Sequence, residues 1–361
     1  MGKVISMQEA LSSFSGKRVF VTGHTGFKGA WLTFLLKELG AEVMGFALPP
    51  GSGPSHFNLL NLKDKIMHIE GDIRDSSSLN DAVAYFQPEY VIHLAAQALV
   101  KKSYEDPVST FDTNVMGSVN LLDAVRNNHS VRSLVYITSD KCYENVEWIW
   151  GYRENDRVGG RDPYSASKGA AEIVFSSYAR SFFDSRKDLG AASTRAGNVI
   201  GGGDWAADRI IPDCIRAIEK GLPITLRNPE ATRPWQHVLE PLSGYLLLAA
   251  QLYRQPDSFS GPWNFGPSSL DVRNVEQVAI SIIEHLGRGQ IKVESSEHQH
   301  HEARLLQLNC DKAQQLLRWA PRWGVEKTLA ATSEWYKVFL EGGDIESVTR
   351  SQLRDYFPEL L

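Results

Sequence analysis

A glycine-rich turn between two apolar segments near the start of the chain constrains the fold more than any other feature. Residues 17–22 (Lys-Arg-Val-Phe-Val-Thr) predict a strand, residues 23–29 (Gly-His-Thr-Gly-Phe-Lys-Gly) a turn, and residues 30–39 a helix. Gly40 predicts the end of that helix, and residues 41–46 predict a second strand. Strand, turn, helix and parallel strand in such a short stretch form a βαβ unit.

The glycines of this turn indicate a site for a pyrophosphate. Gly23, Gly26 and Gly29 allow backbone N–H groups to approach phosphate oxygens at the N-terminus of the helix. An ordinary tight turn is the alternative, and the flanking strand and helix weaken it. No acidic residue ends the second strand to hold ribose hydroxyls, and no Arg stands there for a 2′-phosphate. The sequence therefore leaves the choice between NAD and NADP open, and we favour NAD.

Further strand segments alternate with helical segments along the first half of the chain. Residues 65–70, 90–94 and 133–139 predict strands, and residues 112–126 predict a long helix. This alternation predicts an α/β protein with a doubly wound, Rossmann-like parallel sheet, in which ligands bind at the carboxyl ends of the strands.

The length of 361 residues exceeds that of one average domain. We expect residues 1–197 and 230–265 to form a dinucleotide-binding domain. Residues 198–229 and 266–361 are expected to form a smaller, interleaved C-terminal substrate domain. The stretch 198–204, which is rich in glycine, is expected to be a flexible loop.

Composition and charge exclude several other classes of function. The formal net charge of -5 gives no reason to expect a nucleic-acid partner. We expect a cytoplasmic protein without a membrane partner, because no apolar run is long enough to cross a bilayer and no signal peptide is evident. Three scattered cysteines argue against disulfides or a zinc site. The cluster His298, His300 and His301 lacks a further ligand, so we expect no metal.

A Tyr and a Lys at helical spacing form the strongest chemical signal in the chain. Tyr164 and Lys168 are four residues apart and therefore share one helix face. We expect the ammonium of Lys168 to lower the pKa of the Tyr164 phenol, which is otherwise too high for a base at neutral pH. Ser139, at the end of a predicted strand, can hydrogen-bond the same substrate hydroxyl. Together they can take a proton from an alcohol as its hydride leaves.

These motifs, in this order, resemble the extended short-chain dehydrogenase/reductase family over nearly the whole chain. The resemblance is carried by T-G-x-x-G-x-x-G at 22–29, H-L-A-A at 93–96, Asn114 and Y-x-x-x-K at 164–168. It implies that a group of residues at the strand ends binds the dinucleotide. They are Gly23, Thr25, Gly26, Phe27, Gly29, Asp72, Ile73, Leu94, Ala95, Ala96, Thr138, Tyr164 and Lys168.

Within this family the tripeptide Ser139-Asp140-Lys141 is similar to that of the nucleotide-sugar 4,6-dehydratases. Lys141, with the segments 147–156 and 231–237, resembles the subgroup that acts on a cytidine diphosphate sugar. The resemblance implies a lyase that oxidises C4, eliminates water across C5 and C6, and returns the hydride to C6. Ser139, Tyr164 and Lys168 would serve the oxidation. Lys141 would be the base at C5, and Asp140 the acid at C6.

The resemblance also implies the substrate contacts and partners. Guanidinium groups suit a diphosphate, so we expect the nucleotide sugar to be bound by Asn198, Arg209, Arg227, Arg233 and Arg304. It implies a homodimer or a dimer of dimers, and a role in deoxysugar synthesis for surface polysaccharide such as lipopolysaccharide O-antigen. An epimerase or oxidoreductase of the same family, a dTDP- or GDP-sugar dehydratase, and a cofactor-binding scaffold without turnover remain alternatives.

Overall fold

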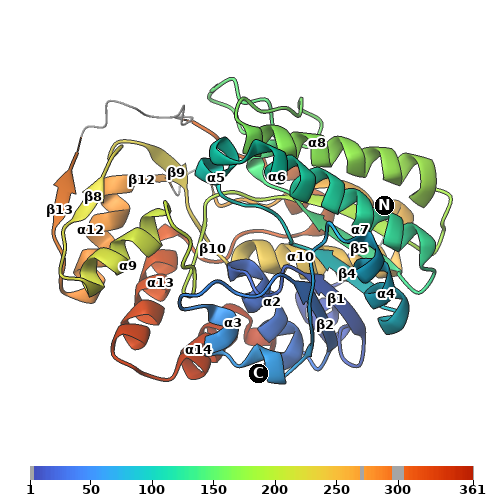
Figure 1. The fold of residues 1–361 in the computed structure, drawn as a ribbon, viewed down its shortest axis with the longest axis horizontal. Helices are drawn as coiled ribbons and strands as arrows, with labels where there is room; N and C mark the ends of the chain where they lie inside the picture. The colour runs from blue at the N-terminus through green and yellow to red at the C-terminus, as the bar shows by residue number, and fades with distance from the viewer. Residues whose placement is uncertain (1–3, 269–271, 295–304, 361) are drawn as a thin grey trace.

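A seven-stranded parallel sheet forms the centre of the molecule (Figure 1). The computed structural model describes residues 4–268, 272–294 and 305–360. The strand order is β11-β6-β5-β4-β1-β2-β3, and every pairing is parallel, which confirms the predicted doubly wound, Rossmann-like sheet. The strands are β1 Arg18–Thr22, β2 Glu42–Ala47, β3 Met67–Glu70, β4 Tyr90–His93, β5 Ser133–Ile137, β6 Gly190–Arg195 and β11 Gly261–Asn264.

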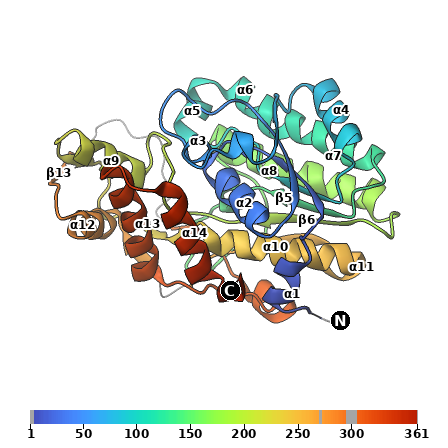
Figure 2. The same ribbon diagram turned by 90° about the horizontal axis from the view of Figure 1, so that it is seen from below.

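Helices cover both faces of this sheet, each over its own hydrophobic core. On one face, α1 (Met7–Ser12), α2 (Phe27–Glu38) and α10 (Leu239–Arg254) contribute to the larger core. On the other, α4 (Ser76–Phe86), α7 (Gly117–Asn127) and α8 (Pro163–Tyr178) enclose the second. Figure 2 shows α10 on one side of the sheet and α4 and α7 on the other. Burial on both faces explains why the sheet strands read as apolar runs.

The helices next to the strand ends begin at side-chain caps. Asp162 caps α8 by accepting a 3.0 Å hydrogen bond from the Ser165 N–H, and Pro163 occupies the first helical position. Asp106 caps α6 (Pro107–Phe111) in the same way. The helix predicted from residue 112 in fact begins here, and α6 continues through a π-helical turn, Asp112–Met116, into α7. A π turn of this kind is common at functional sites.

Short strands and helices build the second half of the molecule. β7 (Val199–Ile200) pairs with β10 (Gln236–His237), so the expected flexible loop at 198–204 contains a strand, because a distant segment satisfies its backbone. Two further strand pairs are formed, by β8 (Ile224–Leu226) with β13 (Ile291–Val293) and by β9 (Thr232–Pro234) with β12 (Val272–Asn274). The helices of this half are α9 Ile210–Glu219, α12 Val275–Leu286 and α13 Val325–Leu340.

The C-terminal helix α14 (Ile345–Tyr356) packs back onto the first half of the chain. Arg350 pairs with Glu38 of α2 at 2.8 Å, and Glu346 pairs with Lys65 at 2.5 Å. These ion pairs join α14, from the predicted substrate domain, to the predicted dinucleotide-binding domain. The division of the chain into these two interleaved domains remains a prediction. The remaining short elements are α3 His56–Leu59, α5 Val100–Glu105, α11 Pro256–Phe259, and the 3-10 or π turns Leu62–Asp64, Asp140–Cys142, Ala179–Phe183, Ala313–Leu317 and Pro358–Leu360.

Within the described ranges, no helix has the length and apolar character needed to span a bilayer. The same part of the chain contains no group of three or more His, Cys, Asp or Glu side chains arranged to hold a metal ion. His298, His300, His301 and Arg304 lie outside the described residues.

Candidate active site

One large cavity lies at the carboxyl ends of the sheet strands, between the sheet and the second half of the chain. Its volume is about 1960 Å³. It brings together every described residue that the sequence proposed for the site. These are Gly23, Thr25, Gly26, Phe27, Gly29, Asp72, Ile73, Leu94, Ala95, Ala96, Thr138, Ser139, Asp140, Lys141, Tyr164, Lys168, Asn198, Arg209, Arg227 and Arg233.

The glycine turn is a cradle in which side chains do not fit. Gly23 has a φ of +74°, and a Cβ there would lie 2.6 Å from the backbone nitrogen of Ala95. A Cβ on Gly29 would lie 2.1 Å from the carbonyl oxygen of Gly23. The turn therefore packs against its own helix and against the chain after β4. Its backbone, at the start of α2, suits the phosphates of a dinucleotide.

Two polar side chains that line the cavity, Asp72 and Thr25, are hydrogen-bonded to neighbouring residues. Asp72 accepts hydrogen bonds of 2.9 and 2.6 Å from the Arg74 guanidinium, which lowers the pKa of the carboxyl. Thr25 Oγ1 donates a 2.9 Å hydrogen bond to the carbonyl of Leu48, so the turn holds the segment after β2. Asp72 is thus placed beside the cavity with one strong partner of its own.

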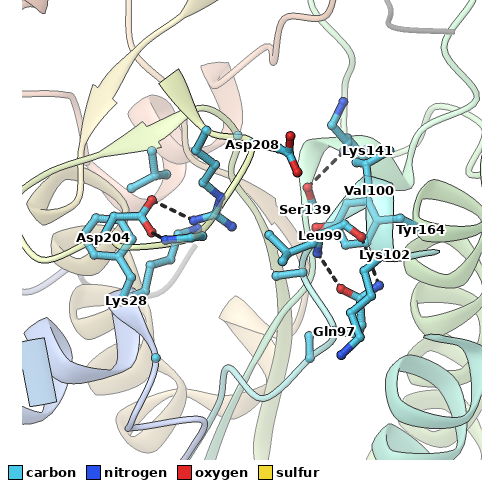
Figure 3. Close-up of a pocket in the computed structure, with 18 of the residues that line it drawn as sticks. Lys28, Gln97, Leu99, Val100, Lys102, Ser139, Lys141, Tyr164, Asp204 and Asp208 are labelled. Atoms are coloured by element: carbon cyan, nitrogen blue, oxygen red, sulfur yellow. Dashed lines mark hydrogen bonds and ion pairs between the residues drawn. The ribbon is translucent and has the colours of Figure 1, made fainter. Parts of the chain in front are cut away.

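Tyr164, Lys168 and Ser139 converge on the middle of the cavity. Tyr164 and Lys168 lie on one face of α8, and all three residues are less than a tenth exposed. Figure 3 shows Ser139 beside Tyr164. Burial raises the pKa of Tyr164 to about 12, and it lowers the pKa of Lys168 to about 8. The expected lowering of the Tyr164 pKa by Lys168 is therefore wrong, because burial outweighs the opposing effect of the Arg209 charge.

Asp140 and Lys141, although adjacent in sequence, point in different directions. Asp140 is 4% exposed, and its Oδ1 accepts a 2.9 Å hydrogen bond from Ser139 Oγ. Its carboxylate packs on Gly197, where an added Cβ would lie 1.8 Å from Oδ2. Lys141 extends away from Ser139 and Tyr164 (Figure 3). No ion pair joins Asp140 and Lys141 in the described part of the chain, so the two groups are free to hold separate roles.

A buried ion pair beneath these residues was not identified from the sequence. Glu172, one turn beyond Lys168 on α8, accepts hydrogen bonds from Arg195 Nη2 at 2.8 Å and Nε at 3.0 Å. Arg195 Nη1 donates to the Tyr143 hydroxyl at 2.7 Å. The sequence held one signal for this ion pair. Residues 164, 168 and 172 share one helix face, and a Glu within an apolar segment needs a cationic or hydrogen-bonding partner.

Asn114 ties the chain after β4 to α8. Its Oδ1 accepts a 2.8 Å hydrogen bond from the Gln97 N–H, and its Nδ2 donates to Ser167 Oγ at 2.9 Å. Ser167 in turn donates to the carbonyl of Tyr164 at 2.7 Å. The π turn that carries Asn114 thus positions the first turn of α8, and with it the phenol.

Cationic side chains surround the cavity from both halves of the molecule. Lys28 lies near Asp204 (Figure 3), and burial lowers its pKa to about 8, with Arg209 as the second cause. Arg209 Nη1 pairs with the buried Asp204 at 2.9 Å. Arg227 pairs with Asp208 at 3.2 Å. These guanidinium groups face a cavity that a diphosphate could enter, and sequence reasoning had not identified Asp204 as a partner.

The remaining two substrate candidates lie on the same side of the cavity. Asn198, which directly precedes β7, adopts a φ of +52°. Arg233 is in β9, is 9% exposed, and donates from Nη1 to the carbonyl of Thr232 at 2.8 Å.

A parallel Rossmann-like sheet, a glycine cradle, and a Ser, Tyr and Lys set at one cavity define an enzyme of the short-chain dehydrogenase/reductase class. The family model described as GDP-mannose 4,6 dehydratase matches residues 20–332. The chain belongs to this family.

Comparisons with individual proteins agree with this assignment. The chain is 48% identical over 347 residues to CDP-glucose 4,6-dehydratase of Salmonella typhimurium, covering 95% of this chain and 97% of the relative. Its structure resembles that of Thermus thermophilus UDP-glucose 4-epimerase in complex with NAD, with a TM-score of 0.75, 27% identity, and coverage of 89% and 99%. It also resembles that of dTDP-glucose 4,6-dehydratase of Bacillus anthracis, with a TM-score of 0.75, 21% identity, and coverage of 92% and 100%.

Proposed function

We propose that the protein is a lyase that converts CDP-glucose to CDP-4-keto-6-deoxyglucose with bound NAD. The observation that carries the proposal is the joint placement of Ser139, Asp140, Lys141, Tyr164 and Lys168 at one cavity. The near full-length similarity to a relative named CDP-glucose 4,6-dehydratase supports the substrate. The NAD complex of the Thermus epimerase supports the cofactor, and the glycine cradle fits its pyrophosphate.

The difficulty of the reaction explains why an oxidising group is needed. The C5 proton of glucose is not acidic until C4 becomes a ketone. NAD supplies a hydride acceptor for the first step and a hydride donor for the last. Tyr164 takes the proton of the C4 hydroxyl, Ser139 hydrogen-bonds that hydroxyl, and Lys168 holds the nicotinamide ribose.

Elimination then requires a base at C5 and an acid at C6. Lys141 is the base, and the flexible side chain must rotate toward the sugar from the direction shown in Figure 3. Asp140, buried beside Ser139, is the acid. Epimerases and simple oxidoreductases of the class need neither group. Asp140 and Lys141 are therefore the residues that favour a dehydratase.

The diphosphate and the nucleotide occupy the second half of the cavity. Arg209, Arg227 and Arg233, with Asn198, line that part and are the proposed substrate contacts. Arg304 remains a proposed contact from the sequence. Asp204 pairs with Arg209 at 2.9 Å, so diphosphate binding must share or replace that ion pair.

A panel of CDP-, dTDP-, UDP- and GDP-glucose tests the proposal, with the 4-keto product followed by its absorbance in alkali. We expect product from CDP-glucose. No product from any of the four sugars would contradict the proposed function, and preference for another nucleotide would correct the substrate.

Solvent deuterium at C5 tests the roles of Asp140 and Lys141. Lys141→Ala is expected to lose deuterium incorporation by a factor of about 10² or more, as removal of a general base does. Asp140→Asn is expected to slow release of the C6 hydroxyl. Wild-type rates of incorporation and of product formation in both variants would remove these assignments.

We further propose a cytoplasmic homodimer, or a dimer of dimers, that serves deoxysugar synthesis for surface polysaccharide such as O-antigen. Exposed apolar side chains on α6, on the π turn and on α8 support the dimer. They include Val108 at 78%, Met116 at 51% and Ile173 at 60% exposure. The three helical segments lie side by side on the outer surface (Figure 1), as an interface between helices requires.

A further inference from the structure

The proposed reaction leaves two residues in protonation states that differ from those in which it starts. Tyr164 accepts the C4 hydroxyl proton and ends the cycle as a neutral phenol. Asp140 gives a proton to the departing C6 hydroxyl and ends as a carboxylate. Lys141 takes a proton from C5 and returns one to C5 when hydride reaches C6, so its state does not change. One proton must therefore pass from Tyr164 to Asp140 before each cycle.

The side-chain hydrogen bonding around Ser139 matches the end of that cycle. Ser139 Oγ donates a 2.9 Å hydrogen bond to Asp140 Oδ1, so the carboxyl oxygen is the acceptor, which is the role that a carboxylate can fill. Burial keeps the phenol of Tyr164 neutral by raising its pKa to about 12. The Ser139 side chain also lies beside Tyr164 (Figure 3), so one hydroxyl adjoins both groups. All three side chains are buried, with exposures of 8%, 4% and 8% for Ser139, Asp140 and Tyr164.

We propose that Ser139 is a proton relay that resets the enzyme by connecting Tyr164 to Asp140. The Ser139 hydroxyl gives its proton to Asp140 Oδ1 and takes the phenol proton of Tyr164. One O–H bond breaks on Tyr164 and one forms on Asp140, while Ser139 is regenerated and no group is oxidised or reduced. A single transfer thus makes both the phenolate base and the carboxylic acid. The relay rests on the proposed function and deepens it.

The surrounding charges act on the Tyr164 end of this relay. The Asp140 charge disfavours the Tyr164 phenolate, whereas the Arg209 charge favours it. Transfer of the proton to Asp140 removes the unfavourable neighbour at the moment when the phenolate forms. Lys28 lies across the cavity beside Asp204 (Figure 3), and the Asp140 charge acts on its pKa as well. The relay therefore removes the charge that opposes the phenolate in the same step that forms the phenolate.

The rate of C4 oxidation in Asp140→Asn distinguishes the relay from independent roles. The holoenzyme with saturating NAD is mixed with CDP-glucose, and bound NADH is followed by its absorbance in the first turnover. Without a relay, removal of the Asp140 charge favours the phenolate and leaves this step unchanged or faster. With a relay, Tyr164 loses its proton acceptor, so the step slows by roughly tenfold or more.

Ser139 variants complete the test. Ser139→Ala is expected to slow C4 oxidation by a similar factor, whereas Ser139→Thr, which keeps a hydroxyl, stays within about threefold of wild type. The double variant Ser139→Ala with Asp140→Asn should be no slower than the slower single variant. The rate of C4 oxidation is also measured in mixtures of H₂O and D₂O. Its dependence on the deuterium fraction should indicate two transferred protons for the wild type and fewer for Asp140→Asn.

Two outcomes overturn the relay while leaving the proposed function intact. The first is NADH formation at the wild-type rate in Asp140→Asn. The second is a double variant whose rate of C4 oxidation is reduced by the product of the two single-variant factors. Absence of NADH and of 4-keto product with the wild-type enzyme would instead contradict the proposed function itself. Far-UV circular dichroism of each variant separates loss of folding from loss of proton transfer.

Discussion

Arg195 and Glu172 form a bidentate ion pair beneath the candidate active site, with Nη2–Oε2 and Nε–Oε1 distances of 2.8 and 3.0 Å. Both side chains are about 4% exposed. Glu172 also accepts hydrogen bonds from Thr138 and Ser193, and Arg195 donates to Tyr143. The pair therefore joins α8, which carries Tyr164 and Lys168, to the ends of β5 and β6 and to the turn that carries Asp140.

Glu172→Gln is expected to destabilise the protein by about 3–5 kcal/mol at neutral pH, because it leaves the Arg195 charge buried without its partner. The folded-state pKa of Glu172 lies below its ordinary value of 4.5. Its contribution to stability is therefore complete above that value and is lost as the pH falls through the folded pKa. Urea unfolding at several pH values checks this. The exposed Glu284→Gln is the control, and equal stability of wild type and Glu172→Gln at pH 7 would contradict the prediction.

Gly29→Ala is expected to weaken NAD binding by roughly tenfold or more, because its Cβ would lie 2.1 Å from the Gly23 carbonyl and displace the cradle. Isothermal titration with NAD measures the loss. Gly51→Ala is the matched control, since Gly51 also lines the cavity but an added Cβ meets nothing within 4 Å. Similar NAD affinities for both variants would show that the turn does not hold the dinucleotide.

Tyr164 is expected to remain a neutral phenol in the ligand-free protein up to about pH 10, because burial raises its pKa to about 12. The difference in phenolate absorbance between wild type and Tyr164→Phe should show no step between about pH 7 and 10. Tyr85→Phe, which removes a phenol that is 74% exposed, calibrates the signal of one tyrosine. A step below about pH 9 would show that neighbouring charges outweigh burial.

Ile173→Asp is expected to yield monomers, because it places a charge in the apolar surface of α6, the π turn and α8 proposed as the dimer interface. Light scattering after size exclusion measures the mass. Ile280→Asp on α12, where Ile280 is 42% exposed, is the control for a charge on another apolar surface position. A monomeric wild type would remove the dimer proposal, and a dimeric Ile173→Asp would move the interface elsewhere.

Much of the fold could be predicted because its signals are local. The glycine-rich segment 23–29 follows β1 and leads into a helix, as its neighbours in sequence indicate, although α2 already begins at Phe27 rather than at residue 30. Tyr164 and Lys168 share a face because four residues span about one helical turn. β7 was missed because two residues of strand, Val199–Ile200, are defined by pairing with β10 more than thirty residues away rather than by their own pattern.

The sequence by itself determined the parallel sheet, the glycine turn and the shared helix face of Tyr164 and Lys168, because periodicity and spacing follow from backbone geometry. The family resemblance supplied most of the other predicted residues that line the cavity. Only the tertiary structure decided the electrostatics among them. Burial gives Tyr164 a raised pKa where the neighbouring Lys168 had predicted a lowered one. Glu172 of α8 is paired with Arg195 of β6, and the local backbone conformation pairs Asp204 with Arg209 and Asp140 with Ser139. Desolvation and charge pairing depend on what surrounds a group in three dimensions, which the order of residues does not state.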